Sequence, residues 1–289
     1  MAWVIQPAAA AKRPVPNAPR VTAASCDALR EISIVDEQGD RRPIYVPAER
    51  PLTVFLDGRE LVTLMTLGAC PEMLVLGYLR NQRLIGDVTM IESLAVDWNR
   101  GSATVITRAG IGGGGTGAAP GIVGTACGLG TVFGDLMMQV EAGALPQAES
   151  ARISRGTLLQ VLDTMRLHDA IHRAAGSVHS CALFQGAELL VSIEDVSRHN
   201  GLDIVAGWMA FHGVAGSDKI LFTTGRLTSE MVMKAAHNGL PIVVSRNGVT
   251  AMGRDLAAKM GMTLFGRAAN RRFLCYVGAE RFDPEAGTD

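Results

Sequence analysis

Apolar residues in the first half of the chain recur in short runs separated by turns, a pattern typical of β-strands. The runs predict strands at 31–35, 53–56, 60–65, 88–97 and 103–107. Asp57-Gly58, between the second and third of these, favours a type I′ hairpin, because both central residues of that turn need a positive φ. One helix opens at Pro71, whose missing N–H costs nothing in a first turn. Residues 30–108 are therefore predicted to form a β-rich domain.

The second half alternates between strands and helices. A helix is predicted at 154–174, stopped by Gly176, and a hairpin follows at 181–184 and 188–193. Three more helices are expected at 200–212, 228–237 and 248–260, and four more strands at 219–224, 241–245, 263–265 and 273–277. This order predicts an α/β layer structure with largely parallel pairing over 135–289, so that the whole chain is α+β.

Residues 109–134, between the halves, contain no charged residue and are rich in glycine. A membrane helix is not expected, because each glycine costs about 1 kcal/mol in a helix interior. The GGGGTG run has no lysine at the spacing of a phosphate-binding P-loop. The stretch predicts a long flexible loop that presents one thiol, Cys127, although a lone cysteine is also a common small apolar core residue.

Composition narrows the class of protein. The net charge of −1 gives no argument for nucleic acid or an anionic membrane as partner. The five cysteines are scattered without a CxxC pair, which suits a reducing cytoplasm better than a disulfide framework. Residues 1–29 are expected to be a disordered tail, since they begin with an Ala- and Pro-rich stretch and lack the apolar run of a signal peptide; a targeting peptide stays open.

Polar side chains gather after two predicted strands, where α/β folds place ligands. Arg198 and His199 precede the helix expected at 200–212, and a capped helix start with Asn200 as N-cap is the alternative interpretation. Arg226 lies with Gly225 and several hydroxyl residues before the next helix, which suits an anion site or a plain capped turn.

A third cluster is basic and lies between the last two strands. It consists of Arg267, Ala268, Ala269, Asn270, Arg271 and Arg272. Guanidinium groups bind phosphate bidentately, so these residues are candidates for binding a pyrophosphate, and a solvated hairpin tip is the alternative. No metal site is expected: a zinc deaminase would carry Glu at the position of Cys181 after His179, and a later P-C-x-x-C that this sequence lacks.

Six segments in the same order resemble the formate dehydrogenase accessory protein FdhD family. They are GACPEMLVLGYL (68–79), TACGLG (125–130), GSVHSCALF (176–184), EDVSRHNGLD (194–203), TTGRLTSEMVMKAA (223–236) and GRAANRRF (266–273). The resemblance implies a cytidine deaminase-like α/β domain over 135–289. It also implies a homodimeric sulfur carrier that takes sulfur from a cysteine desulfurase and passes it to the molybdenum bis-guanine-dinucleotide cofactor of formate dehydrogenase.

By position, the resemblance makes Cys127 the sulfur-carrying residue and Arg267 to Arg272 the cofactor-binding segment. Arg226, Arg198 and His199 are expected to help hold the anionic dinucleotide. Two features depart from the family pattern: Gly130 replaces a second loop cysteine, and Ala269 replaces the first arginine of the cofactor segment. A single thiol still suffices to carry a persulfide.

The main hypothesis is therefore a cytoplasmic sulfur carrier that binds neither nucleic acid nor membrane. Its client is expected to be a formate dehydrogenase or a related molybdenum enzyme. A chaperone that binds and delivers a molybdenum or tungsten cofactor without transferring sulfur is the alternative, motivated by Gly130. A zinc-dependent nucleoside hydrolase is a remoter one.

Overall fold

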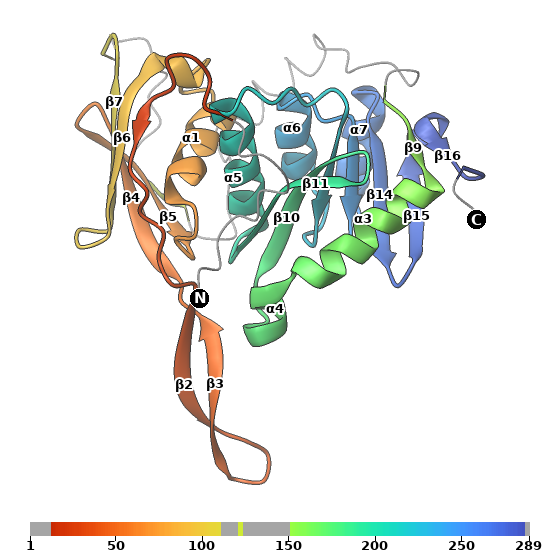
Figure 1. Ribbon diagram of the computed structural model, residues 1–289, viewed down its shortest axis with the longest axis horizontal. Helices are drawn as coiled ribbons and strands as arrows, with labels where there is room; N and C mark the ends of the chain where they lie inside the picture. Colours follow the sequence, from red (N-terminus) through yellow and green to blue (C-terminus); the bar gives the residue numbers. More distant parts are fainter. Residues whose placement is uncertain (1–12, 111–120, 124–150, 287–289) are drawn as a thin grey trace.

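The computed structural model describes residues 13–110, 121–123 and 151–286. Two six-stranded sheets lie side by side, with two packed helices between them (Figure 1). The first sheet has the order β1-β6-β7-β4-β5-β8. Its strands are β1 (Arg20–Val21), β4 (Arg50–Leu56), β5 (Arg59–Thr66), β6 (Ile91–Asp97), β7 (Ser102–Thr107) and β8 (Gly121–Val123).

The second sheet has the order β11-β10-β12-β13-β14-β15. Its strands are β10 (His179–Gln185), β11 (Glu188–Asp195), β12 (Lys219–Thr223), β13 (Ile242–Ser245), β14 (Thr263–Ala269) and β15 (Arg272–Val277). Only the pairs β12–β13 and β13–β14 are parallel. The predicted α/β class is confirmed, but the expectation of largely parallel pairing is wrong, because a hairpin forms each end of the sheet and β10 runs antiparallel to β12.

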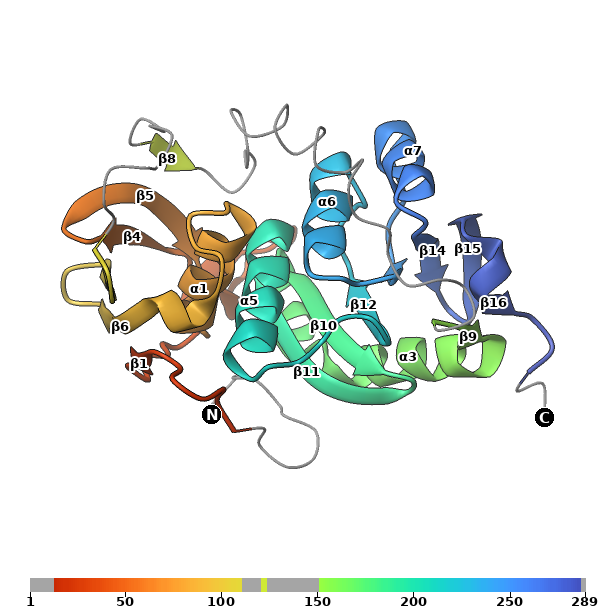
Figure 2. The same ribbon diagram turned by 90° about the horizontal axis from the view of Figure 1, so that it is seen from above.

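Helices cover both faces of the second sheet (Figure 2). One face packs against α5 (Arg198–Phe211), α6 (Ser229–His237) and α7 (Ala251–Lys259), and the other against α3 (Arg155–His168). The alternation of side chains along β12 explains this: Leu221 joins the core under α5 to α7, whereas Phe222 joins the core under α3.

The helix α1 (Pro71–Asn81) joins the two halves by packing against α5. The backbones approach so closely that a Cβ on Gly77 would lie 1.7 Å from the Asp203 carbonyl oxygen, and one on Gly207 would lie 2.0 Å from that of Met73. The Asn81 amide also donates to Asp203 Oδ1 at 2.6 Å. A single hydrophobic cluster therefore runs from the first sheet through α1 and α5 to the second.

Two local predictions of the first half are confirmed. Asp57 and Gly58 have φ values of 48° and 80°, as a type I′ turn requires, and they join β4 to β5. The predicted helix begins at Pro71.

The prediction of a disordered tail is wrong for residues 13–29. β1 pairs with β6, and the Val15 N–H donates to the Phe211 carbonyl. Val15 and Val21 pack against the hydrophobic core, so a few apolar residues in a Pro-rich stretch are enough to anchor it. Glu72 adds two bonds, from the Thr22 hydroxyl and the Ala24 N–H.

Three further boundaries differ from the sequence prediction. The single helix expected at 154–174 is divided at Asp169 into α3 and α4 (Ala170–Ala175). The helix expected to start at Asn200 begins at Arg198, with the Ser197 side chain as its cap. Within the predicted glycine loop, β8 pairs in parallel with β5, whereas Cys127 lies outside the described residues.

The hairpin of β2 (Leu29–Val35) and β3 (Arg41–Pro47) projects from the body of the molecule (Figure 1). Its second strand was not predicted, since Pro43 and Pro47 interrupt the alternation. The remaining elements are short: β9 (Ile153–Ser154), β16 (Phe282–Asp283) and two 3₁₀ turns, Val88–Met90 and Ala279–Arg281. Among the described helices, none has the length and apolar character needed to cross a membrane.

Candidate functional site

The carboxyl ends of β11 and β12 bring together the starts of α5 and α6, as the sequence predicted. The antiparallel strand β10 begins at the same edge and adds His179. We call His179, Arg198, His199, Arg226 and Glu230 the helix-start cluster.

Arg198 lies across Gly225, where a Cβ would come within 2.6 Å of the Arg198 side chain. The glycine of the T-G-R segment is thus required for this arginine to reach its place. Arg226 follows directly and is exposed.

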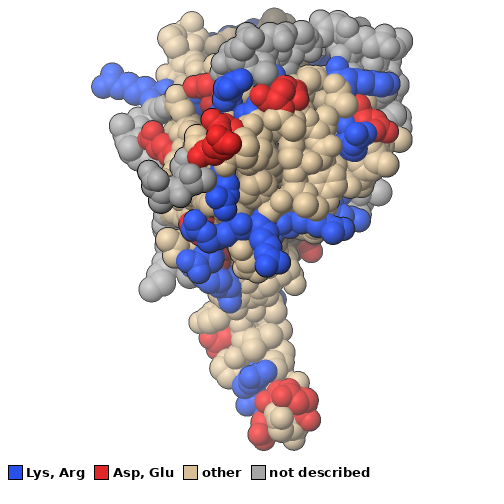
Figure 3. Space-filling model, turned by 90° about the vertical axis from the view of Figure 1, so that its right-hand side faces the viewer, with Lys and Arg blue, Asp and Glu red and all other residues tan. Residues whose placement is uncertain are grey.

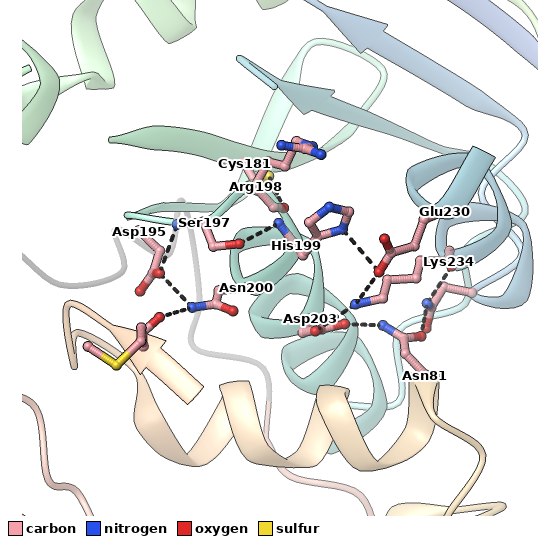
Figure 4. A network of polar contacts seen from close by, with 12 residues as sticks. Asn81, Cys181, Asp195, Ser197, Arg198, His199, Asn200, Asp203, Glu230 and Lys234 are labelled. Carbon is pink, nitrogen blue, oxygen red and sulfur yellow. Dashed lines mark hydrogen bonds and ion pairs between the residues drawn. The ribbon is translucent and has the colours of Figure 1, made fainter. Parts of the chain in front are cut away.

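His199 and Glu230 are held by a buried chain of charges (Figure 4). His199 Nδ1 lies 3.3 Å from Glu230 Oε1, and Lys234 Nζ lies 3.9 Å from the same oxygen. Lys234 also pairs with Asp203 Oδ2 at 2.8 Å. One buried ammonium therefore lies between two carboxylates, and one of those carboxylates faces the imidazole.

Burial decides the charge of these groups. It lowers the pKa of His199 to about 3, with Lys234 and Arg198 acting in the same direction, and it raises the pKa of Glu230. His199 is therefore a neutral imidazole at pH 7. Burial also lowers the pKa of Arg198, as does the neighbouring charge of Arg226. The guanidinium groups of Arg198 and Arg226 repel each other, so an anion bound between them would be stabilising.

Apart from His199 Nδ1 and Glu230 Oε1, which face each other at 3.3 Å, two polar atoms of this region are buried without a hydrogen bond to any described residue. They are Arg198 Nε and the hydroxyl of Thr228, the N-cap residue of α6, whose side chain makes no capping bond. Such groups cost free energy unless they find a partner. They support the interpretation of the α5 and α6 starts as a binding site rather than only as capped helix ends.

Asp195 fixes the start of α5 relative to the first sheet. Its carboxylate accepts from the Thr66 hydroxyl at 2.6 Å and the Leu67 N–H at 3.0 Å, and from the Asn200 amide at 2.8 Å. Asn200 thus serves as a bridge, donating also to the Met65 carbonyl, and not as the helix cap. Asp195 and Asn200 thus have a structural role, whereas Arg198 and His199 of the same segment belong to the helix-start cluster.

Cys181 is a buried core residue of β10. Its thiol donates to the Thr223 hydroxyl at 3.3 Å, and burial raises its pKa to about 12, so it stays protonated at neutral pH. Within the part of the chain that the structure describes, no group of three or more His, Cys, Asp or Glu side chains could hold a metal ion.

The predicted cofactor segment borders a cavity of about 920 Å³ between α3 and the β14–β15 turn, which we call the α3 cavity. Ala268, Ala269, Asn270 and Arg271 line it, together with residues of α3 and with Arg246 at the end of β13. Arg267 and Arg272 are exposed nearby and are not among the described lining residues. The cavity is within the usual size range of ligand pockets.

Around the turn that borders the cavity, three residues other than glycine adopt a positive φ, a conformation that glycine adopts without strain. Arg267, Asn270 and Arg271 have φ values of 51°, 51° and 60°. Left-handed backbone costs a residue with a Cβ about 1 kcal/mol or more. Strain of this kind is common where a side chain has a function. Arg271 Nη1 pairs with Asp163 Oδ2 on α3 at 2.8 Å.

Hydrogen bonds connect the two groups along one edge of the sheet. The Gly225 carbonyl accepts from the Ser245 hydroxyl at 2.6 Å, and that hydroxyl accepts from the Asn247 N–H at 2.9 Å. The Asn247 carbonyl then accepts from the Arg267 N–H at 2.7 Å. Figure 3 shows a band of basic side chains across the side of the molecule that bears the second sheet.

Several residues of these groups were missed from the sequence. Arg246 directly follows a predicted strand, so the rule that singled out Arg198 and Arg226 would have found it. Arg246 pairs with Asp169, at the break between α3 and α4. Asp163 and Lys234 lie on helices far from the strand ends, and no pattern in the sequence marks them.

The model of the FdhD/NarQ family matches residues 47–283. The chain belongs to this family. It is 30% identical over 246 residues to the "Sulfur carrier protein FdhD" of Geobacillus kaustophilus, covering 82% of this chain and 89% of that one. It is also 30% identical over 259 residues to the protein of the same name from Bacillus subtilis, with 85% and 94% covered.

A solved structure agrees with the fold. The crystal structure of a putative formate dehydrogenase accessory protein from Desulfotalea psychrophila matches with a TM-score of 0.69 at 25% identity. The match covers 88% of this chain and 98% of that one, so both sheets and the helices between them belong to the family fold.

Proposed function

We propose that the protein is a sulfur carrier that passes sulfur from a cysteine desulfurase to the molybdenum bis-guanine-dinucleotide cofactor of a formate dehydrogenase. Membership of the FdhD/NarQ family carries the proposal, together with the names of its relatives, which are sulfur carrier proteins and a formate dehydrogenase accessory protein. The cofactor is its cargo, and its place of action is the cytoplasm, as a homodimer.

Cys127 is the proposed carrier residue. Its thiolate attacks the terminal sulfur of the persulfide on the desulfurase, so that a new S–S bond forms on Cys127 while the S–S bond of the donor breaks. The donor cysteine leaves as a thiolate. No oxidant is needed for this exchange, and one thiol on this chain is enough.

The two groups at the edge of the second sheet are the proposed sites for the anionic dinucleotide. The α3 cavity offers Arg246 and Arg271, and the helix-start cluster offers Arg198 and Arg226. His199, neutral at pH 7, supplies a polar contact rather than a charge. These features support nucleotide binding because guanidinium groups bind phosphate in a fixed, bidentate geometry.

Mass spectrometry of the intact protein tests the carrier role. The full chain is incubated with a cysteine desulfurase and cysteine, and the expected product is heavier by one sulfur atom. Cys127→Ser is expected to abolish the product, whereas Cys26→Ser, which changes a half-buried free cysteine, is expected to leave it intact.

Absence of the heavier species on wild type, or its persistence on Cys127→Ser, would overturn the carrier role. Guanine-nucleotide binding that survived in either case would favour a chaperone that delivers the cofactor without transferring sulfur.

A further inference from the structure

Asp163 is the only carboxylate among the described residues that line the α3 cavity. The other polar groups there are mostly cationic, with Arg166, Arg246 and Arg271 around it. Apolar side chains form part of the wall, among them Leu162 and Phe222. A cavity with several guanidinium groups, an apolar wall and one carboxylate is suited to a ligand that has anionic, planar and hydrogen-donating parts.

The fold fixes the position of this carboxylate. Asp163 lies in the middle of α3, and its neighbours Leu158, Val161 and Met165 are buried against the second sheet. Ser154 caps the helix by accepting from the Thr157 N–H at 3.0 Å. Asp163 thus has a defined place on a rigid element.

Arg271 keeps the carboxylate oriented without using all of its capacity. One guanidinium nitrogen contacts Oδ2 at 2.8 Å. A carboxylate has two oxygens and about four acceptor positions, so further donors can bind it. The strained backbone of Arg271, with a φ of 60°, is maintained beside it.

We infer that Asp163 reads the guanine base of the bound nucleotide, accepting hydrogen bonds from the ring N1–H and the exocyclic amino group, while the arginines of the α3 cavity hold its phosphates. This inference rests on the proposed function. Guanine presents both donors side by side. Adenine presents an unprotonated ring nitrogen at the first position and no amino group at the second, so that it repels a carboxylate there. Asp163 is thus a specificity-determining residue for guanine.

Calorimetric titration of the full chain with GDP, IDP and ADP tests the inference. IDP keeps the ring N1–H and lacks only the exocyclic amino group. Wild type is expected to bind GDP more tightly than IDP, and IDP more tightly than ADP. Asp163→Asn is expected to reduce the GDP-to-IDP preference by about tenfold, the usual effect of one charge-assisted hydrogen bond. It is expected to bring GDP and ADP close to equal affinity.

Asp255→Asn is the matched control, because Asp255 also forms an exposed pair with an arginine, Arg254, but on α7. It is expected to change none of the three affinities. Circular dichroism of each variant checks folding.

Two results would overturn this inference without affecting the proposed function. In the first, Asp163→Asn keeps the wild-type order and ratios of the affinities for GDP, IDP and ADP. In the second, it increases all three affinities by the same factor, which would show that Asp163 only offsets the charge of Arg271. A wild type that binds none of the three nucleotides would overturn the proposed nucleotide site as well, so the two failures are distinguishable.

Discussion

The helix-start cluster and the α3 cavity both carry cationic side chains at one edge of the same sheet, but they are held in different ways. Beneath the cluster, Lys234 is buried between Asp203 and Glu230, and each of these carboxylates lies on a helix of the core. At the cavity, Arg271 pairs with a single carboxylate, and its side chain remains 63% exposed. The charges around Lys234 are thus part of the packed core, whereas Arg271 lies at the surface.

Stability and ligand binding are therefore expected to depend on different residues in this molecule. Changes in the buried charges beneath the cluster, Lys234, Asp203 and Glu230, should act mainly on folding, because they leave charges without a partner or force packed helices apart. Changes at the cavity should act mainly on nucleotide affinity, because exposed ion pairs contribute little to stability.

The largest effect is expected from Gly77→Ala. Gly77 lies where α1 packs against α5, the helix that bears Arg198 and His199. The new Cβ would lie 1.7 Å from the Asp203 carbonyl, so α1 cannot keep its place on α5. We expect a loss of about 3 kcal/mol or more in the free energy of unfolding, measured by urea denaturation.

Gly248→Ala is the control, since a Cβ there meets nothing within 4 Å. It should change stability by less than about 1 kcal/mol. Equal losses in the two variants would contradict the close packing of α1 on α5.

Lys234→Met and Arg271→Met together compare the buried charges with the exposed pair at the α3 cavity. Lys234→Met leaves Asp203 and Glu230 buried without their cation, and about 3 to 5 kcal/mol of stability is expected to be lost. Arg271→Met, which breaks the exposed pair with Asp163, should cost less than about 1 kcal/mol. Similar costs in urea denaturation would show that the two groups are not held differently.

The pH dependence of folding should reveal His199. Its folded pKa of about 3 lies below the ordinary value of 6.5, so between these values the unfolded chain binds a proton that the folded chain does not. Stability due to this group is present above 6.5 and is lost as the pH falls, by at most about 1.4 kcal/mol per pH unit. Glu230, whose pKa is raised, acts in the opposite direction.

His199→Asn is therefore expected to make stability fall less steeply on acidification, as followed by urea denaturation from neutral pH downward. An unchanged slope in His199→Asn would show that the imidazole is not held neutral by burial.

The smallest effect on stability is expected from Arg271→Gly. Glycine accepts a φ of 60° without strain, so the melting temperature should stay nearly constant, the relief of about 1 kcal/mol being offset by the freedom gained by the unfolded chain. GDP affinity should fall in the same variant, by calorimetric titration. A lower melting temperature with unchanged GDP affinity would assign Arg271 to the scaffold.

Much of the fold could be predicted where local pattern and local structure coincide. Asp57-Gly58 dictates a turn by its own backbone, and Pro71 begins a helix whatever lies around it. The break at Asp169 could not be predicted, because it depends on Ser180 and Arg246, which reach its carboxylate from β10 and the end of β13. The order of residues 13–29 depends likewise on β6 and Phe211, distant in the sequence.

The candidate site divides in the same way. Arg198 and Arg226 could be predicted as neighbours, since the ends of adjacent strands share an edge. The pairing of Asp163 with Arg271 could not, because a helix and a turn more than 100 residues apart meet only in the folded chain. Cys127 rests on the family resemblance alone, since it lies outside the described residues.

Complementation in cells tests whether sulfur passes through Cys127. Wild type and Cys127→Ser are expressed in cells that lack their own FdhD, together with a formate dehydrogenase, and the activity of that enzyme is measured. GDP titration of the purified variant confirms that its nucleotide site is intact. We expect full activity with wild type and none with Cys127→Ser, although both bind GDP equally. Full formate dehydrogenase activity with Cys127→Ser would contradict it.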